Sequence, residues 1–582
     1  MISLSGKQWI FKSADELKIL ALQQKFGLSD SLARILAGRH VSLEAIPSFL
    51  TPKIQDLMPD PSRLLDIDTA VQRVQKAIHN AEKIVVYGDY DVDGATSVAL
   101  LVRYFRALGV PVETYIPDRL AEGYGVNLAA LETLHKKGAQ LVLMVDCGTT
   151  AVAEIEAARA WGLDAIILDH HAAGVALPPA VAVINPHRVD QPPVLHTPQL
   201  CAAGVVFLFL VALQRALKKA HFFSQENPPP DLIDYCDFVA LGTVCDVMPL
   251  QGLNRAFVRR GLILMSKRQN LGLAALMKVA GIQSAVSAYH LGFALGPRIN
   301  ADGRIGSSQL GLQLLTEQDD LAAKDLAEQL HELNDKRQKM EKKLLEEALQ
   351  QIEQNQLQKR PVLLVGAEEW HPGLVGIAAS RLKDQFQKPC FVASFDGAWA
   401  KGSARSLEGL DLGVLIHEAV SVGILEKGGG HALAGGFTLA RAQWDAFYEF
   451  LTQKTQKFME TFQPVLEIDA ELSLSGATLD LLRDLSQLEP FGTGNPLPRF
   501  CFHRARPAFV RPIGSGHLQC TLEDEAGNTL AAVAFRCQNT KMGEALLKKD
   551  YLSLVGHLQI NEWRDQKSPQ FIIEDGAWNR EI

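Results

Sequence analysis

Between residues 83 and 186, short β-branched segments alternate with longer segments of helical periodicity, and no other feature of the sequence constrains the fold as strongly. We expect strands at 83–87, 112–116, 141–145, 164–168 and 181–184, with helices at 96–108, 128–137 and 151–161. Strand–helix–strand repetition predicts a parallel sheet with right-handed crossovers. Sheets of this kind bind ligands at the carboxyl ends of their strands.

The chain has 582 residues, which is too long for one hydrophobic core, because single cores stop growing at roughly 250–300 residues. Apolar residues recur every three to four positions from 326 to 352, which predicts one long amphipathic helix. Short alternating segments broken by glycines predict a small antiparallel β-barrel near the end. The expected units are a mixed, partly helical lead-in at 1–68, an α/β domain at 69–316, a connecting helix at 317–360, a second α/β lobe at 361–463 and the barrel at 464–582.

The composition is that of an ordinary folded protein, with 47% hydrophobic and 21% charged residues. The net charge of -8 does not by itself indicate a polyanionic partner, although a cluster of acidic metal ligands would lower it. Eight cysteines without a CxxC pair indicate reduced core residues. The longest uncharged apolar run, 201–213, is shorter than the roughly 20 residues of a membrane span, and no signal peptide is visible. We therefore expect a cytoplasmic protein without a membrane partner.

Three carboxylates, Asp89, Asp91 and Asp93, occupy alternate positions directly after the first predicted strand. Anions this close repel one another unless cations lie between them, and Mg²⁺ and Mn²⁺ prefer oxygen ligands. The pattern therefore indicates a cation site. The alternative is an exposed acidic loop or the N-cap of a helix, and the motif alone does not decide between them.

Two further predicted strands end in the same kind of residue. The strand at 141–145 runs into Asp146, and the strand at 164–168 runs into Asp169-His170-His171. A lone Asp after a strand is commonly a helix cap and a lone His is commonly a core residue. Three strand ends of one sheet nevertheless converge at the edge where ligands bind, which favours a shared site. Asp246 also follows an apolar run, but sequence spacing cannot place it beside the others.

These acidic motifs together resemble the ordered motifs of the DHH phosphoesterase superfamily, including its Asp-His-His sequence. Segments around Arg298, Trp370, Arg405 and His431 resemble the associated DHHA1 region, and their order is similar to that of RecJ-like exonucleases. The resemblance covers nearly the whole chain. It implies an α/β fold with a parallel-sheet DHH domain, a second α/β DHHA1-type lobe joined to it by a long helix, and a C-terminal OB-like β-barrel.

The resemblance also implies two divalent cations, Mn²⁺ or Mg²⁺, close enough to activate water and to stabilise the leaving oxygen. The implied ligands are Asp89 and Asp91 for one cation, Asp93, His170 and Asp246 for the other, and Asp146 as a bridge. His171 would contact the scissile phosphate or the leaving group, and Asp169 would orient the histidine pair. The alternative is that His171 and Asp169 are merely structural.

The second lobe supplies polar residues in Gly- and Ser-containing loops. Guanidinium groups match phosphate geometry, so the resemblance implies an anchor for a 5′-phosphate and digestion in the 5′→3′ direction. For isolated arginines, surface salt bridges are the alternative. Asp302 stands where RecJ-like sequences are expected to carry alanine. The candidate phosphate and DNA contacts are Arg298, Asn300, Arg304, Arg381, Ser403, Arg405 and His431.

Basic and aromatic residues alternate in the predicted barrel from 499 to 511 without an acidic residue between them. Arginines suit phosphates and rings suit base stacking, although some of these rings belong to the barrel core. The candidate contacts to single-stranded DNA are Arg499, Arg504, Arg506 and Arg511.

The predicted function is a single-stranded-DNA exonuclease that releases nucleotides during DNA repair and recombination. One alternative is a DHH phosphodiesterase for short oligonucleotides or cyclic dinucleotides, but such small substrates need no barrel. Another is a non-catalytic DHH scaffold in a replication complex, which the intact acidic and histidine positions disfavour. By resemblance, single-strand-binding protein and a helicase are candidate partners, and we expect a monomer.

Overall fold

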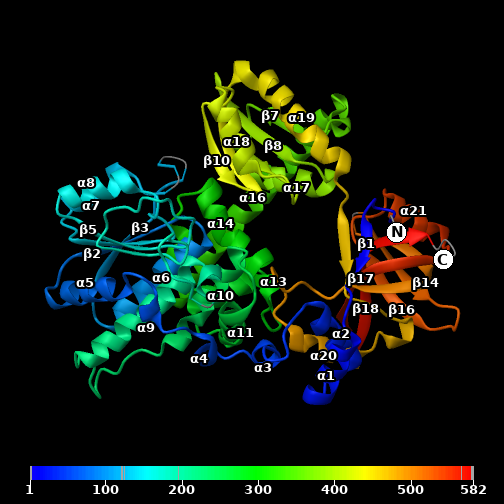
Figure 1. Cartoon of the computed structure of the whole chain (residues 1–582), viewed down its shortest axis with the longest axis horizontal. Helices are drawn as coiled ribbons and strands as arrows, with labels where there is room; N and C mark the ends of the chain where they lie inside the picture. Colours follow the sequence, from blue (N-terminus) through cyan, green and yellow to red (C-terminus); the bar gives the residue numbers. More distant parts are fainter. Residues whose placement is uncertain are drawn as a thin grey trace.

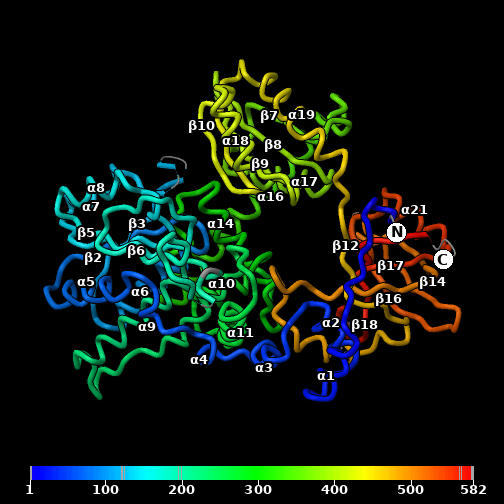
Figure 2. The backbone as a smooth tube through the Cα atoms, viewed as in Figure 1, coloured from blue at the N-terminus to red at the C-terminus, as the bar shows by residue number. Residues whose placement is uncertain are grey.

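The computed structural model describes residues 3–119, 122–123, 125–194, 196–514, 516–564 and 566–578. In Figure 1 the first α/β domain lies on the left, the second lobe lies above the centre and the barrel lies on the right. The tube in Figure 2 shows that the N-terminal segment runs beside the barrel, at the opposite end of the molecule from the first sheet.

The first domain contains the expected parallel sheet, in the order β3-β2-β4-β5-β6. Every residue of β2 and β4 is buried, as expected for strands covered on both faces. The predicted strands agree with the observed ones to within one residue at each end, and all four pairings are parallel, which confirms the predicted sheet. The strands are β2 Ile84–Gly88, β3 Val112–Tyr115, β4 Leu141–Val145, β5 Asp164–Leu168 and β6 Ala182–Ile184.

Helices cover both faces of this sheet. α5 (Ile67–His79), α6 (Val92–Ala107) and α9 (Ala202–Lys219) share one core with alternate strand residues such as Val86 and Leu143. α7 (Leu128–Lys136) and α8 (Val152–Ala160) pack on the other face. Although α9 is strongly apolar, no helix in the described ranges is long and apolar enough to cross a membrane.

A helical extension completes the first domain and leads into the connecting helix. α16 is 35 residues long, which corresponds to about 52 Å of helix. Its first half packs Ala323 and Leu330 into the first domain, and its second half packs Leu344 and Ile352 against the second lobe. The predicted long helix that joins the two lobes is therefore confirmed. The helices are α10 Cys236–Cys245, α11 Gly252–Ser266, α12 Leu271–Val279, α13 Ala288–His290, the π-helical turn η4 Leu291–Leu295, α14 Gly296–Ile305, α15 Leu310–Thr316 and α16 Asp320–Gln354.

The second lobe has a mixed sheet in the order β10-β11-β9-β8-β7, in which only β7 and β8 are parallel. The glycine-rich stretch near 430 forms the hairpin of β10 and β11 at the sheet edge. The elements of the lobe are β7 Leu363–Ala367, α17 Val375–Phe386, β8 Cys390–Asp396, β9 Trp399–Arg405, α18 Leu412–Ser421, β10 Lys427–His431, β11 Ala434–Ala440 and α19 Trp444–Thr461.

The C-terminal strands close into a barrel as expected, because β14 pairs with β15 on one side and with β17 on the other. The prediction of a wholly antiparallel barrel is wrong, since β16 pairs with β18 in parallel. The elements are β13 Ala470–Glu471, α20 Leu479–Leu485, β14 Phe500–Ile513, β15 His517–Glu523, β16 Thr529–Ala534, α21 Lys541–Lys548, β17 Leu552–Trp563 and β18 Gln566–Trp578.

The N-terminal segment packs mainly with this barrel. β1 (Gln8–Phe11) pairs in parallel with β12 (Val465–Ile468), and α1 (Glu16–Phe26) and α2 (Asp30–Gly38) share a core with barrel residues. Two short helices, α3 (Ile46–Leu50) and α4 (Ile54–Leu57), then lead to the first domain. The N-terminal segment is therefore mixed and mostly helical, as expected. Its strand β1 lies beside the barrel, at the end of the molecule opposite the first sheet (Figure 2).

Candidate metal centre

The acidic residues after β2 are positioned by a tight turn into α6. Asp91 is the N-cap of this helix and accepts hydrogen bonds from the backbone N–H groups of Asp93 and Gly94. A Cβ atom at Gly94 would lie 2.3 Å from the carbonyl oxygen of Asp89, so only glycine permits this close approach. Asp91 is therefore a helix N-cap, which was the alternative to a cation ligand, and it also lies close to the carboxylates of Asp89 and Asp146.

Asp93 is buried in the first turn of α6 and is fixed by a second helix. Its carboxylate accepts hydrogen bonds from the backbone N–H groups of Ala202 at 2.6 Å and Ala203 at 3.0 Å, at the start of α9. The N-terminus of a helix stabilises a negative charge. These two hydrogen bonds fix the orientation of the carboxylate and partly offset its burial, which raises the pKa of Asp93 above its ordinary value.

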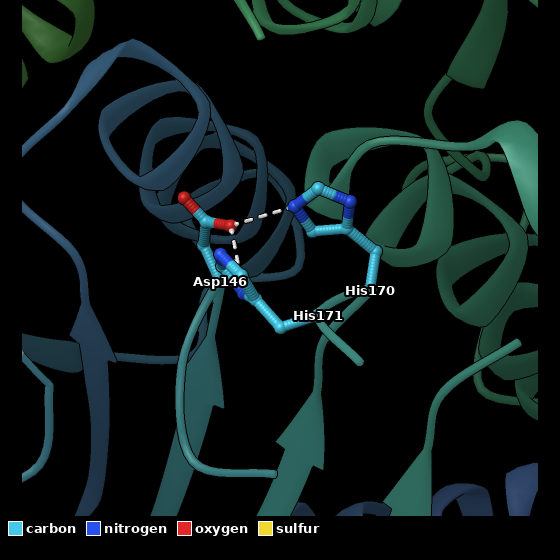
Figure 3. A group of neighbouring side chains, drawn as sticks. All are labelled: Asp146, His170 and His171. Atoms are coloured by element: carbon cyan, nitrogen blue, oxygen red, sulfur yellow. Dashed lines mark ion pairs between the residues drawn. The ribbon is translucent and has the colours of Figure 1, made fainter. Parts of the chain in front are cut away.

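Asp146 and His170 follow the neighbouring strands β4 and β5, and Figure 3 shows both side chains with His171. His170 Nε2 lies 3.2 Å from Asp146 Oδ1, and His171 Nδ1 lies 3.9 Å from the same oxygen. His170 Nε2 also lies 3.5 Å from Asp246 Oδ2 and 3.7 Å from Asp93 Oδ2. Asp246, which sequence spacing could not place, therefore joins the strand-end residues.

The ligand atoms form three overlapping groups that could each hold a metal ion. Within each group the candidate atoms lie within 4.8 Å of one another. The first and third groups share Asp146, and the second and third share His170, so the groups form one continuous site. The groups are Asp89, Asp91 and Asp146; Asp93, His170 and Asp246; and Asp146, His170 and His171.

Four buried atoms at this site make no hydrogen bond within the described part of the chain: Asp89 Oδ1, Asp146 Oδ1, Asp246 Oδ2 and His170 Nε2. Buried polar atoms are almost always partnered, and leaving one unpaired is costly. All four belong to the three candidate groups, and they combine carboxylate oxygens with one imidazole nitrogen. This donor set fits hard divalent cations such as Mn²⁺ and Mg²⁺.

The carboxylates titrate as a crowded, buried cluster. Burial and the charge of Asp91 raise the pKa of Asp89 to about 7, and burial with the charges of Asp93 and Asp91 raises the pKa of Asp246 to about 8. Burial and neighbouring carboxylates also raise the pKa of Asp146 well above its ordinary value. A bound cation would offset the repulsion that keeps these groups protonated.

Asp169 orients the histidine pair without belonging to any of the three groups. Its Oδ1 accepts hydrogen bonds from the backbone N–H of His170 at 2.7 Å and pairs with His171 Nδ1 at 2.8 Å. Its Oδ2 accepts a hydrogen bond from the backbone N–H of Thr149. Burial opposes protonation of His171, but the hydrogen bond and charge of Asp169 outweigh it and raise the pKa of His171 to about 9.

A cavity of about 460 Å³ opens beside the carboxylates and is lined by both lobes. α14 approaches the second lobe closely, since Arg304 donates a hydrogen bond to the carbonyl of Gly373 at 3.2 Å, and a Cβ atom at Gly373 would lie 2.5 Å from the carbonyl oxygen of Arg304. The polar residues that line the cavity are Asp89, Tyr90, Asp91, Arg119, His171, Asn300, Arg304, Lys401, Ser403 and Arg405.

Arg298, Asn300 and Arg304 lie on α14 of the first domain, not in a loop of the second lobe as expected, and Arg381 lies on helix α17. Four of the seven candidate phosphate contacts, Asn300, Arg304, Ser403 and Arg405, line the cavity with Asp89 and Asp91. The other three do not. Arg298 turns toward His331 of α16 at 3.3 Å, and Arg381 pairs with Glu341 at 3.4 Å in a neighbouring cavity. His431 lies on the exposed edge strand β10.

Two basic residues that line the cavity, Arg119 and Lys401, were not predicted from the sequence. Arg119 follows β3, so it lies after a fourth strand end of the same sheet, and the rule that identified the aspartates could have found it. Lys401 lies on β9 two residues before Ser403, on the same face of the strand. A search for basic residues at period-two spacing around Ser403 would have detected it.

The candidate DNA-binding arginines in and directly before the barrel strand β14 have protein partners. Arg499 pairs with Glu574 at 2.7 Å, Arg506 pairs with Glu523 at 2.7 Å and Arg504 pairs with Glu525. Arg511 donates to the amide oxygen of Gln519. The acidic partners come from neighbouring strands and turns, which the uninterrupted basic run in the sequence did not reveal.

Family models match three parts of the chain. The model of the DHH family N-terminal domain matches residues 83–243, that of the DHHA1 domain matches 359–460 and that of the RecJ OB domain matches 468–575. Together they cover both lobes and the barrel.

Curated relatives match the chain almost from end to end. The single-stranded-DNA-specific exonuclease RecJ of Bacillus subtilis is 34% identical and covers 98% of this chain and 71% of its own length. The enzyme of the same name from Escherichia coli is 33% identical over 89% of this chain and 91% of its own length.

A solved structure matches the arrangement of all parts. RecJ of Thermus thermophilus in complex with Mn²⁺ superimposes with a TM-score of 0.83 and 28% identity, over 99% of this chain and 80% of that one. The structure of the same protein with Mg²⁺ gives a TM-score of 0.75 and 26% identity, over 98% and 79% of the two chains. With this metal-compatible site, these motifs and this end-to-end similarity, the chain belongs to the RecJ family of single-stranded-DNA-specific exonucleases.

Proposed function

We propose that this protein hydrolyses the phosphodiester bonds of single-stranded DNA from the 5′ end with two divalent cations. One observation carries the proposal: a single cavity is lined by Asp89 and Asp91 of the acidic cluster and by the cationic residues Arg304, Lys401 and Arg405. Carboxylates can hold the cations, and the basic side chains can hold the phosphates of the substrate. The names of the relatives indicate the same substrate.

The proposed ligand sets follow the three groups of neighbouring atoms. Asp89 and Asp91 would hold one cation, Asp93, His170 and Asp246 would hold the other, and Asp146, whose Oδ1 lies 3.2 Å from His170 Nε2, would serve both. When bound, the two cations supply an activated water and neutralise charge on the leaving oxygen. The protein orients these ligands through the start of α9, which fixes Asp93, and through the turn after β2, which fixes Asp91.

His171 is proposed to hold a proton near the substrate. Its Nδ1 is occupied by Asp169, its raised pKa keeps the ring protonated at neutral pH, and its side chain lines the cavity. A cationic imidazole at this position can contact the scissile phosphate or donate to the leaving oxygen. Asp169 acts through His171 and is a positioning residue.

The second lobe is proposed to bind the 5′-terminal phosphate. Arg405 donates to Ser403 Oγ at 2.9 Å, so the two side chains form one polar patch on β9, with Lys401 on the same strand. Burial lowers the pKa of Arg405, because a charged guanidinium loses its hydration inside the protein. A bound phosphate would stabilise this buried charge. An anchor for the terminal phosphate beside the cation site accounts for digestion in the 5′→3′ direction.

Both alternative functions have a weaker basis. A phosphodiesterase for cyclic dinucleotides or short oligonucleotides would not need a barrel, and in this protein Arg536 of the barrel lines the cavity next to the metal centre. A non-catalytic scaffold would not need six candidate ligands that converge, four of which have a buried atom without a hydrogen bond. All residues that line the cavity come from one chain, which supports a monomer. That single-strand-binding protein and a helicase are partners stays a prediction from the family resemblance.

The function is tested with end-labelled DNA. With Mn²⁺ or Mg²⁺, the protein should release mononucleotides from the 5′ end of single-stranded DNA, and a chelator should stop the reaction. Blunt double-stranded DNA of the same sequence is the control and should persist. Release from the 3′ end, or faster hydrolysis of a cyclic dinucleotide than of a long strand, would contradict the proposal.

A further inference from the structure

A polar residue also follows β6, the strand next to β5 in the first sheet. Asn185 comes directly after this strand, is 1% exposed, and was not among the residues predicted from the sequence. Buried polar side chains are almost always hydrogen-bonded, so the partners of Asn185 indicate what it holds in place. Those partners come from three separate strand ends.

The side-chain amide of Asn185 makes three hydrogen bonds. Its Nδ2 donates to the hydroxyl oxygen of Thr149 at 2.8 Å and to the backbone carbonyl of His171 at 2.8 Å. Its Oδ1 accepts a hydrogen bond from the backbone N–H of His187 at 2.8 Å. Thr149 follows β4, His171 follows β5 and His187 follows β6, so one side chain joins the loops after three neighbouring strands.

These partners explain why the residue is an amide. A backbone N–H only donates and a backbone carbonyl only accepts, so a side chain between His187 and the carbonyl of His171 must offer both an acceptor and a donor. The bond to His187 alone is an Asx turn, which Asp or Ser could also form. The turn therefore accounts for the oxygen of Asn185, but not for the nitrogen that reaches the loops after β4 and β5.

The backbone of the histidine pair is held from both sides. Asp169 accepts hydrogen bonds from the backbone N–H groups of His170 at 2.7 Å and His171 at 3.2 Å. Asn185 holds the carbonyl of His171, and Nδ1 of His187 donates to the carbonyl of His170. All four backbone polar groups of the pair have partners, so a change in its orientation breaks at least one of these bonds.

We propose that Asn185 is a positioning residue for hydrolysis, which holds the carbonyl of His171 and thereby fixes where the His171 imidazole meets the substrate. This inference rests on the function proposed above. His171 lines the metal cavity, whereas Asn185 does not, so Asn185 acts only through its neighbour. Misplacement of a reacting group by about 1 Å can cost about 100-fold in rate, so a residue outside the cavity can still control turnover.

The test uses Asn185→Ser in the full-length protein. A serine hydroxyl can keep the turn to the N–H of His187 but is too short to reach the carbonyl of His171. In single-turnover reactions the rate of hydrolysis should fall by about 10–100-fold, while KM measured at steady state changes little, because His171 acts at the cleaved bond. Mn²⁺ binding, measured by calorimetry without DNA, should stay close to that of the parent, because His187 still holds the carbonyl of His170.

A double-mutant cycle separates positioning from general support of the fold. In a His171→Ala background, Asn185→Ser should have little further effect on the rate, since no imidazole is left to position. Asn270→Ser is the matched control, because Asn270 is also buried, caps α12 and does not line the metal cavity. It should lower the melting temperature without lowering the rate. Asn185→Thr, which keeps the hydroxyl and fills more of the space, is the second variant and should behave like Asn185→Ser.

An unchanged rate in both Asn185 variants would overturn the proposal. So would a loss of Mn²⁺ affinity as large as the loss of rate, which would show that Asn185 supports His170 instead, or an equal loss of rate with and without His171. A failure of the proposed function would appear separately, as absence of hydrolysis by the unmodified protein.

Discussion

At Asp146, a single side chain combines backbone strain with charge crowding. Its φ angle is 60°, in the left-handed region that non-glycine residues rarely adopt, and its carboxylate faces other buried acids. Residues held in such conformations persist where the surrounding structure fixes them, often at functional sites. The backbone conformation and the buried charge of Asp146 therefore both oppose folding. A role in holding cations explains why an aspartate occupies this position.

Replacement of Asp146 should separate activity from stability. Asn tolerates the left-handed region, so Asp146→Asn removes the charge with little change in the backbone. Substitution of a residue that only supports a metal ligand typically lowers metal affinity or activity by about 10–100-fold. Loss of the ligand itself should therefore lower kcat by at least about 100-fold. Without cations, the same variant should melt at a higher temperature than the parent, because one repelling carboxylate is gone. A lower melting temperature without cations would contradict this account of the cluster.

The raised pKa values of Asp89 and Asp246, about 7 and about 8, predict a pH dependence of cation binding. A carboxyl whose pKa is higher in the folded than in the unfolded state binds more protons when folded, so the cation-free protein loses stability as the pH rises from about 4 to 8. A bound cation removes this penalty. The increase in melting temperature on adding Mn²⁺ should therefore be larger at pH 8.5 than at pH 6, and an equal increase at both would contradict the prediction.

Arg405 should control the preference for a 5′-phosphate. Arg405→Ala removes the guanidinium that pairs with Ser403 in the cavity, and kcat/KM for a 5′-phosphorylated strand should fall by about 10–100-fold. The decrease should be smaller for the same strand with a 5′-hydroxyl. Arg298→Ala is a matched control, because Arg298 faces α16 and does not line the metal cavity. An equal decrease for both DNA ends would exclude the anchor.

Among the elements, those specified by local patterns were predictable. The strands of the first sheet were predicted to within one residue because each is a short segment rich in β-branched residues between segments of helical periodicity. The long helix was predicted because its apolar period continues through both lobes. The pairing of β1 with β12 was not predictable, since it joins opposite ends of the chain. Arg298 and the paired barrel arginines were ambiguous for the same reason: their partners lie far away in sequence.

Asp302, which departs from the expected family pattern, stabilises the turn between α14 and α15. It is buried and accepts hydrogen bonds from the backbone N–H groups of Ser307 at 3.0 Å and Leu310 at 2.7 Å. Asp302→Ala leaves these donors without partners and should lower the free energy of unfolding by about 1–3 kcal/mol. Hydrogen exchange should increase at 306–311, and Asp302→Asn, which keeps one acceptor oxygen, should show a smaller change. Unchanged exchange in the Ala variant would show that the turn does not need this side chain.

At the scale of the whole molecule, a buried cation contacts both segments that connect the catalytic domain to the barrel. Arg255 of α11 is almost fully buried and donates hydrogen bonds to the carbonyls of Phe49 and Glu489, both at 2.7 Å. Its guanidinium also lies 4.2 Å from the ring centroid of Phe49. One side chain of the first domain therefore joins the N-terminal segment and the chain that enters the barrel.

Arg255→Met should loosen this junction while leaving the metal centre in place. The loss of the guanidinium leaves several buried carbonyls without donors, so hydrogen exchange should increase at 46–50 and 487–490. If the barrel must face the cavity next to the metal centre to hold a long strand, KM for long DNA should rise while the rate on a trinucleotide changes little. Arg255→Lys, which can reach only some of the carbonyls, should give an intermediate effect. Equal losses on long and short DNA would show that Arg255 supports the catalytic domain itself and does not orient the barrel.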